Sequence, residues 1–279
     1  MSYKSIATVV TDSETNEAAL RAAVKLTGDQ QAHLDVLCLG IDHTQPGFYY
    51  AGANALVLQD NLVSAQNEAQ ELERLISARL NKEPIRWSVD ALTVQTVSLT
   101  SAVAHHTRLT DLVVLPKPYG PGRGHEAEAI LEATMFEGQV PVLVIPDGAE
   151  WPEQIDSIVV AWNESTEALD AIRAALPLLQ AAGSVNIAII DPPPHGPDRS
   201  DPGGQLSQML VRHGVKAEVS VLARTMPRVS DILIRHSADR DADLLVMGAY
   251  GHSRFRESIL GGATRNMLEM SEIPVLLAH

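Results

Sequence analysis

The sequence predicts an α/β protein built from two tandem domains, each with a parallel sheet flanked by helices. The first reason is an internal repeat: Lys4–Leu26 and Asp156–Leu178 align without a gap as an apolar run, a polar turn and an alanine-rich stretch of helical period. The second is that short, continuous apolar runs alternate with helical stretches, a pattern typical of parallel strands covered on both faces. Length is compatible with this organisation without deciding it, because 279 residues could form one large domain or two of ordinary size.

The second half shows this alternation most clearly. Its apolar runs predict five strands, at Ser157–Ala161, Val185–Ile190, Ala217–Leu222, Leu244–Met247 and Val275–Ala278. Its helical stretches predict four helices, near Glu167–Ala181, Gly204–Arg212, Val229–Arg240 and Gly262–Met270. In parallel sheets with crossover helices a ligand binds beyond the carboxyl ends of the strands. The glycine-rich segment that follows the fourth strand is therefore expected on the binding edge.

Two later pairs of segments extend the repeat, Thr110–Gly120 with Ala242–Gly251 and Val140–Asp147 with Ile273–His279. The joint falls near Pro146–Gln154, a polar stretch with Pro and Gly that is typical of a linker, so we expect domains at residues 1–148 and 154–279. The halves differ in their inserts. The first carries His43–Lys82, a Gly/aromatic segment leading into a long amphipathic helix, and the second carries Asp191–Gly204, a predicted surface loop.

Composition and charge exclude several classes of protein. Twenty-one Lys and Arg against 35 Asp and Glu give a net charge of -14 with no basic run, so nucleic acid is not an expected partner. No apolar run approaches the roughly 18 residues of a membrane-spanning helix, and the amino-terminal run is too short for a signal peptide. We therefore expect a cytoplasmic protein without membrane contact. The single cysteine, Cys38, lies in an apolar run and is interpreted as a small buried hydrophobe.

The segment Gly248–Met270 holds four glycines and then becomes helical in pattern. Gly248 and Gly251 allow a tight turn without a Cβ in the way, and Gly261 with its neighbours opens a helix whose first amides have no intrahelical partner. Two interpretations fit these residues. Free amides converging at a helix N-terminus form an anion site, for which phosphate is the natural occupant. Alternatively, the glycines serve only a sharp turn and a close contact between helix and sheet.

The spacing of the glycines favours a particular family. Gly248-x-x-Gly251, nine residues, then Gly261 followed by a small residue, with apolar runs on both sides, resembles the nucleotide-binding signature of the universal stress protein family. The duplicated layout, which covers nearly the whole chain, resembles the tandem members of that family. The resemblance implies two flavodoxin-like domains of the adenine nucleotide alpha hydrolase-like type, each with a five-stranded parallel sheet. It also implies that the two domains pack as the single-domain members do in their dimers.

The resemblance also implies a site. In ATP-binding members of the family, loop and helix amides hold the phosphates and ribose, and an aspartate after the first strand contacts the adenosine part. The matching residues of this chain are Ala161, Asn163, Met247, Gly248, Gly251, His252, Gly261, Gly262, Ala263 and Thr264. The implied ligand is ATP, with Mg²⁺ accompanying the nucleotide. The Thr264 hydroxyl has an alternative use in capping its own helix, and His252, Arg254 and Arg256 either screen a triphosphate or are solvated.

The chain departs from the family pattern at the aspartate. Asn163 stands in its place in the second half, and Thr11 in the first, with Asp12 one position late. Asparagine keeps hydrogen-bonding capacity without the charge. Trp162, beside it, is either a platform for a base or part of the core, and the core is favoured.

The first half departs further from the pattern. Pro116 and Pro118 replace the entry to its loop, and proline removes an amide donor. We therefore interpret the first domain as degenerate for nucleotide, with Lys117 and Arg123 on the solvated surface.

These features predict a cytoplasmic stress-response protein that binds an adenine nucleotide in its second domain and acts in regulation. No acid, base or nucleophile is placed for catalysis, and no His or Cys spacing indicates a metal site. We therefore expect neither catalytic residues nor metal ligands. The alternative is a nucleotide-free scaffold or a binder of another small ligand. A homodimer of the tandem chain is a further expectation from the edge strands of the family.

Overall fold

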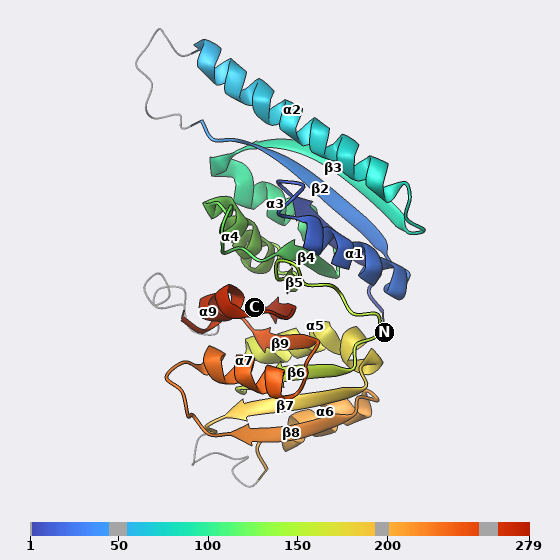
Figure 1. Ribbon diagram of the computed structural model, residues 1–279, viewed down its shortest axis with the longest axis vertical. Helices are drawn as coiled ribbons and strands as arrows, with labels where there is room; N and C mark the ends of the chain where they lie inside the picture. The colour runs from blue at the N-terminus through green and yellow to red at the C-terminus, as the bar shows by residue number, and fades with distance from the viewer. Residues whose placement is uncertain (1, 45–54, 193–200, 251–261) are drawn as a thin grey trace. The chain divides into compact units, whose positions relative to one another are not determined.

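The computed structural model describes residues 2–44, 55–192, 201–250 and 262–279 (Figure 1). The described chain divides into two compact units, Ser2–Val140 and Pro141–His279. Each unit combines a parallel sheet with helices, as the repeat predicts. The Gly251–Gly261 part of the glycine-rich segment lies outside the described residues, as do the aromatic residues of the first insert.

In the first unit four strands form a parallel sheet in the order β3-β2-β1-β4. The strands are β1 (Ser5–Val10), β2 (His33–Asp42), β3 (Arg86–Gln95) and β4 (Leu112–Pro116). The helices are α1 (Glu17–Gln30), α2 (Ala55–Leu80), α3 (Leu99–Thr107) and α4 (His125–Glu132). Two short turns, η1 (Thr96–Ser98) and the π-helical η2 (Ala133–Glu137), extend α3 and α4.

The long helix expected in the first insert is α2, which lies along β2 and β3 (Figure 1). Its buried side is made of small residues near the middle, Ala65 and Ala69, and larger ones toward its end. A Cβ on Gly40 of β2 would collide with the carbonyl oxygen of Ala65, so only glycine allows the helix backbone to lie this close to the strand. Gly40 and the small residues Ala65 and Ala69 therefore allow the close packing of α2 on β2.

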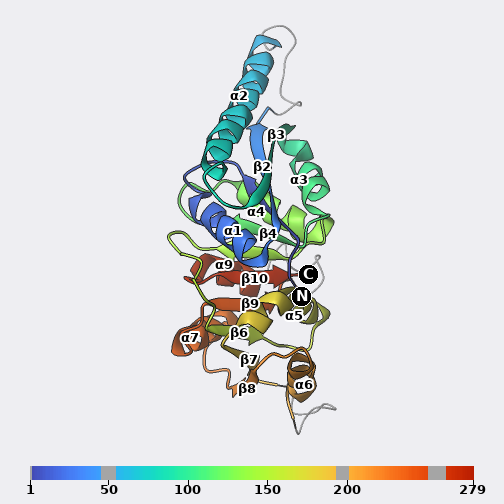
Figure 2. The same cartoon turned by 90° about the vertical axis from the view of Figure 1, so that its right-hand side faces the viewer.

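The second unit contains a five-stranded parallel sheet in the order β10-β9-β6-β7-β8 (Figure 2). Its strands are β6 (Ser157–Ala161), β7 (Ser184–Ile190), β8 (Ala217–Leu222), β9 (Leu244–Gly248) and β10 (Val275–Ala278). Its helices are α5 (Thr166–Ala181), α6 (Gly204–Arg212), α7 (Val229–Asp239) and α9 (Gly262–Met270). The predicted strands and helices of this half are confirmed to within one residue at each end.

One strand of the first repeat belongs structurally to the second unit. β5 (Val142–Ile145) pairs antiparallel with β10, with Val144 opposite Val275. The compact units therefore divide between Val140 and Pro141, whereas the repeat places its joint several residues later. All four residues of β5 are buried, as are all four of β10, which agrees with strands that have both faces covered.

An aspartate before the fourth strand of each repeat ties two strands together. Oδ2 of Asp243 accepts hydrogen bonds from the backbone N–H groups of Asp156 and Ser157, at 2.7 and 3.0 Å. Oδ2 of Asp111 accepts from the two amides at the start of β1, at 2.6 and 3.1 Å. The same bond at the same place in both halves supports a duplication, since nothing in the apolar pattern requires it.

Candidate functional site

The residues singled out in the second half converge on the carboxyl edge of its sheet. Ala161 ends β6, Asn163 follows it in the turn to α5, and Met247 and Gly248 end β9. Gly262, Ala263 and Thr264 form the first turn of α9. The other three members of the set, Gly251, His252 and Gly261, lie outside the described residues.

The β6–α5 turn is held by its own side chains. Oδ1 of Asn163 accepts a hydrogen bond from the Ser165 N–H at 3.2 Å. Oγ of Ser165 in turn accepts from the Ala168 N–H at 3.1 Å and so caps α5. Between them Glu164 has a φ of 62°, in the left-handed region. The carbonyl oxygen of Asn163 is thus used in the turn, and its Nδ2 donor is the part of this exposed side chain that the turn leaves unused.

Trp162 is half-buried, and its backbone N–H donates to the carbonyl of Ala188 on β7 at 3.0 Å. It is therefore not among the buried core residues, where the sequence interpretation favoured it. A half-buried indole next to the exposed Asn163 leaves part of its surface available for contact with a ligand.

Gly248 is required by packing within the protein. A Cβ at this position would lie 2.5 Å from the backbone N of Ala168 and 2.7 Å from the carbonyl carbon of Glu167. Both atoms belong to the first turn of α5, which packs directly against the end of β9. Of the two interpretations that the sequence left open for this glycine, a ligand approach and a close contact between helix and sheet, the structure shows the second.

Thr264 joins the end of β9 to the start of α9. Its hydroxyl Oγ1 accepts a hydrogen bond from the Tyr250 N–H at 3.3 Å, and its side chain is buried. Tyr250 has a φ of 56°, so the chain turns sharply here without a glycine. The preceding residue, Ala249, donates its N–H to the carbonyl of Ala278 at 2.8 Å. The Thr264 hydroxyl thus bonds to the segment that follows β9, a use that no sequence motif indicated.

The first turn of α9 is open to solvent. Gly262 and Ala263 are exposed, and a Cβ on Gly262 would have Asn266 Nδ2 as its nearest neighbour, at an ordinary 3.6 Å. The N-terminal amides of a helix lack intrahelical partners and lie at the positive end of the helix dipole. This turn therefore has both the donors and the room that an anionic ligand requires.

The corresponding edge of the first unit is arranged differently. Oδ1 of the buried Asn16 accepts hydrogen bonds from the N–H groups of Thr11 and Asp12, at 3.4 and 3.3 Å. Oδ1 of Asp12 accepts from the Thr15 and Glu14 amides, at 2.8 and 3.1 Å. The hydrogen bond from the Thr15 amide is the largest of the effects that hold the pKa of Asp12 below its usual value. The amides after β1 are thus already bonded within the protein.

The expectation that Arg123 is solvated surface is corrected by the structure. Its Nη1 donates to the carbonyl oxygen of Thr15 at 2.9 Å, and the side chain is half-buried. Its charge also contributes to lowering the pKa of Asp12. Residues 15 and 123 are more than 100 positions apart, so no local pattern indicated this contact.

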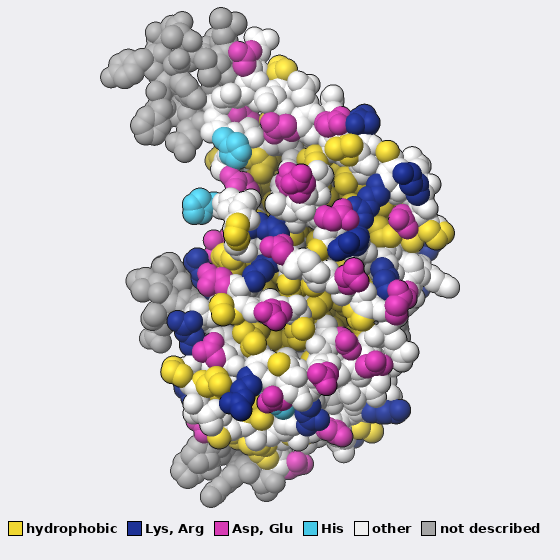
Figure 3. Space-filling model, viewed as in Figure 1, with side chains coloured by type: hydrophobic (Ala, Val, Ile, Leu, Met, Phe, Trp, Pro, Cys, Tyr) yellow, Lys and Arg dark blue, Asp and Glu magenta, His cyan; other side chains and the backbone are white. Residues whose placement is uncertain are grey.

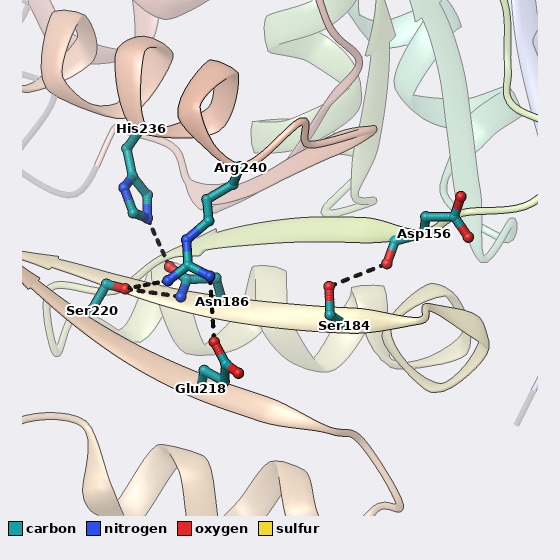
Figure 4. A network of polar contacts seen from close by, with 7 residues as sticks. All are labelled: Asp156, Ser184, Asn186, Glu218, Ser220, His236 and Arg240. Carbon is teal, nitrogen blue, oxygen red and sulfur yellow. Dashed lines mark hydrogen bonds and ion pairs between the residues drawn. The ribbon is translucent and has the colours of Figure 1, made fainter.

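A polar network lies on the second sheet, toward the amino end of β7 (Figure 4). Nε2 of His236 donates to Oδ1 of Asn186 at 2.7 Å, and Nδ2 of Asn186 donates to Oγ of Ser220 at 2.9 Å. Arg240 donates to Ser220 at 3.1 Å and to Glu218 at 3.3 Å. Burial, and then the Arg240 charge, lower the pKa of His236, so the neutral ring is favoured. This network fixes α7 on β7 and β8.

Three observations bear on partners. Among the described residues, no group of three or more His, Cys, Asp or Glu is placed to hold a metal ion. Within the same residues, no helix is both long and apolar enough to cross a membrane. On the face shown in Figure 3, Lys and Arg side chains are scattered among Asp and Glu rather than gathered into a basic patch.

Comparison with known proteins identifies the second half. Residues 154–279 match the model of the universal stress protein family. The second half belongs to that family. A universal stress protein from a Synechocystis strain is 37% identical over 73 residues, which cover 26% of this chain and 24% of the relative. The match thus spans about a quarter of the length of that curated relative.

Solved structures extend the likeness to the whole chain. A universal stress protein from Archaeoglobus fulgidus aligns over 98% of this chain and 97% of its own, with 14% identity and a TM-score of 0.74. A structure from Pseudomonas aeruginosa, described as a putative universal stress protein, aligns over 99% of this chain and 93% of its own, with 16% identity and a TM-score of 0.57. These likenesses show that the whole chain has the fold of tandem universal stress proteins.

Proposed function

We propose that this protein is a cytoplasmic stress-response protein whose second half binds an adenine nucleotide, ATP, and that binding serves regulation rather than catalysis. The observation that carries the proposal is the junction of β9, α5 and α9 at the carboxyl edge of a universal stress protein domain. Gly248 lies against the first turn of α5, and Thr264 holds the end of β9 to the start of α9. This junction leaves the first amides of α9 exposed beside it.

The ligand follows from the chemistry of this edge. Exposed amides at a helix N-terminus bind phosphate through hydrogen bonds and the helix dipole. Trp162 and Asn163 follow β6 on the same edge and supply an aromatic surface and a polar donor for the base and ribose. In this proposal Mg²⁺ enters with the nucleotide phosphates.

The test is calorimetric titration of ATP into the purified full chain and into Gly262→Asp. The Gly262 position accepts a Cβ, so the aspartate introduces a carboxylate where the phosphates would lie without a clash inside the protein. An acidic residue is also favourable in the first turn of a helix. We expect the wild type to bind ATP and Gly262→Asp to lose binding while its thermal stability is unchanged.

The matched control is Gly262→Ser, which keeps the amide and adds a hydroxyl instead of a charge. We expect this variant to bind ATP as well as the wild type or better, because the extra hydroxyl is a further donor to phosphate. If the wild type neither binds ATP nor co-purifies with it, the proposal fails. Equal binding by Gly262→Asp and the wild type would place the nucleotide elsewhere.

A second candidate is a nucleotide-free interaction module of the same fold. The observation that favours it is the use of Asn163 in the β6–α5 turn: the position lacks a carboxylate, and its carbonyl oxygen already accepts the Ser165 N–H. A ligand would then share the Asn163 Oδ1 acceptor with the turn and would find no charge at this position. Absence of bound nucleotide after gentle purification, together with no heat on adding ATP, would favour this candidate.

A further inference from the structure

A cavity of about 200 Å³ lies at the carboxyl edge of the first unit, between the ends of β1, β2 and β4 and the start of α4. Its base is apolar and belongs to the core: Val9, Leu39, Leu115 and Ile130 line it, and each is at most 5% exposed. A cavity of about 150 Å³ with apolar walls accommodates benzene, so this one has room for a small organic molecule. It is smaller than the roughly 300–1,000 Å³ of typical drug-sized ligand sites.

The charged side chains that line the cavity are mostly acidic. Asp12, Glu68 and Glu126 contribute three carboxylates, against the guanidinium of Arg123. Arg123 already donates to the Thr15 carbonyl, and its charge faces Asp12. The hydrogen bonds that lower the pKa of Asp12 keep this carboxylate ionised at neutral pH. The cavity therefore presents an excess of negative charge above an apolar base.

The backbone at the ends of β1 and β4 offers a phosphate few donors. Asn16 accepts the N–H groups of Thr11 and Asp12 at the end of β1. Pro116 supplies no N–H at the end of β4.

At the start of α4 the carboxylate of Glu126 occupies the place where an anionic ligand would bind. A Cβ on Gly124 would collide with Oε2 of Glu126, so this side chain folds back over the residue that precedes the helix. Oε1 of Glu126 lies 3.5 Å from Nδ1 of His43 at the end of β2. An incoming phosphate would meet this carboxylate at the helix terminus and would be repelled by it.

We propose that this cavity binds a small organic cation, an ammonium group carried on a short apolar body. The apolar base accommodates the body, and the carboxylates of Asp12, Glu68 and Glu126 at the rim attract the ammonium group. A molecule of this class satisfies both parts of the cavity, whereas the phosphates of a nucleotide carry the wrong charge for it. The inference concerns the first unit alone and does not depend on nucleotide binding in the second.

The test compares three probes with the same phenyl body and different charge: phenethylamine, 2-phenylethanol and 3-phenylpropionate. Each is titrated into the full chain by calorimetry, and the contact is located by amide chemical shifts in the 11–16 and 122–130 segments. We expect phenethylamine to bind most tightly, the alcohol more weakly and the carboxylate most weakly. Failure of the amine to bind, or a carboxylate that binds as tightly as the amine, would overturn the proposal.

Two variants test the role of charge. Glu126→Gln removes a rim carboxylate at nearly constant side-chain size. We expect it to weaken the binding of phenethylamine by about twofold to fivefold, the range of a partly exposed ion pair, and to leave the binding of 2-phenylethanol unchanged. Glu137→Gln makes the same change in net charge at an exposed residue outside the cavity and should leave the binding of both probes unchanged. Equal effects of the two variants on the amine would refute the site. Gly262→Asp should bind the amine normally, which separates this test from the nucleotide test.

Discussion

Gly248→Ala tests whether this glycine serves the packing of α5. The added Cβ would sit 2.5 and 2.7 Å from backbone atoms of Ala168 and Glu167, whereas Cβ atoms in proteins do not approach other atoms closer than 3.0 Å. These obstacles are backbone atoms of a helix whose first turn is already capped by Ser165, so no side-chain rotation relieves the contact. The helix terminus or the end of β9 has to move by several tenths of an ångström.

Overpacking of this kind costs about 1–3 kcal/mol, and the backbone contact places Gly248→Ala toward the upper end of that range. Gly262→Ala is the matched control, because its Cβ would have its nearest neighbour at 3.6 Å. In the exposed first turn of α9 that change is expected to be neutral, or to stabilise by up to about 1 kcal/mol through helix propensity.

The measurement is urea unfolding of the full-length variants, followed by circular dichroism. A lower denaturation midpoint for Gly248→Ala, with Gly262→Ala at or above the wild type, is the expected result. If both variants have the same denaturation midpoint as the wild type, then the approach of α5 to β9 does not constrain this position. The glycine would then have to be explained by contact with a ligand, and Gly248→Ala should weaken ATP binding without a loss of stability.

Three further predictions concern stability and reactivity. Asp243→Ala removes the acceptor of two backbone N–H groups at the start of β6, and a loss of about 1–3 kcal/mol is expected in denaturant unfolding. The pKa of His236 is lowered in the folded state, so its neutral form contributes stability above about pH 6.5 that is lost as pH falls through the folded-state pKa. His236→Gln, which retains a donor toward Asn186, should reduce the pH dependence of unfolding near that pH by less than about 1 kcal/mol, since the ring is partly exposed; an unchanged dependence would contradict this. Burial raises the pKa of the Cys38 thiol to about 12, so iodoacetamide should modify it only after unfolding, and rapid labelling of the native protein would show that the strand opens.

Much of the fold could be predicted because it is encoded locally. Val159 and its neighbours form one of several continuous apolar runs, and each run of the second half became a strand. The strand β6 is buried on both faces, whereas β8 is half-exposed. The repeat strengthened these predictions, since an element recognised in one half predicted its counterpart in the other. The pairing of β5 with β10 was not predicted, because apolar runs do not encode the partner of a strand.

The candidate site was predictable in place but not in detail. The glycine spacing located the edge on which Gly248 and Thr264 lie, because those residues are close in sequence to a strand end. Their bonds to α5 and Tyr250 depend on distances between separate elements, which residue identity does not encode. Arg123 was missed for the same reason, since its partner at residue 15 lies in another loop.

The place of β5 matters to anyone who wishes to study the second half alone. A fragment begun at residue 154, where the family match starts, would omit the strand that covers one side of β10. The apolar β10 would then become an exposed sheet edge, which favours aggregation through pairing with other chains. A fragment begun at Pro141 keeps this strand beside β10. The ancestral unit of duplication and the present unit of folding thus differ by a single strand.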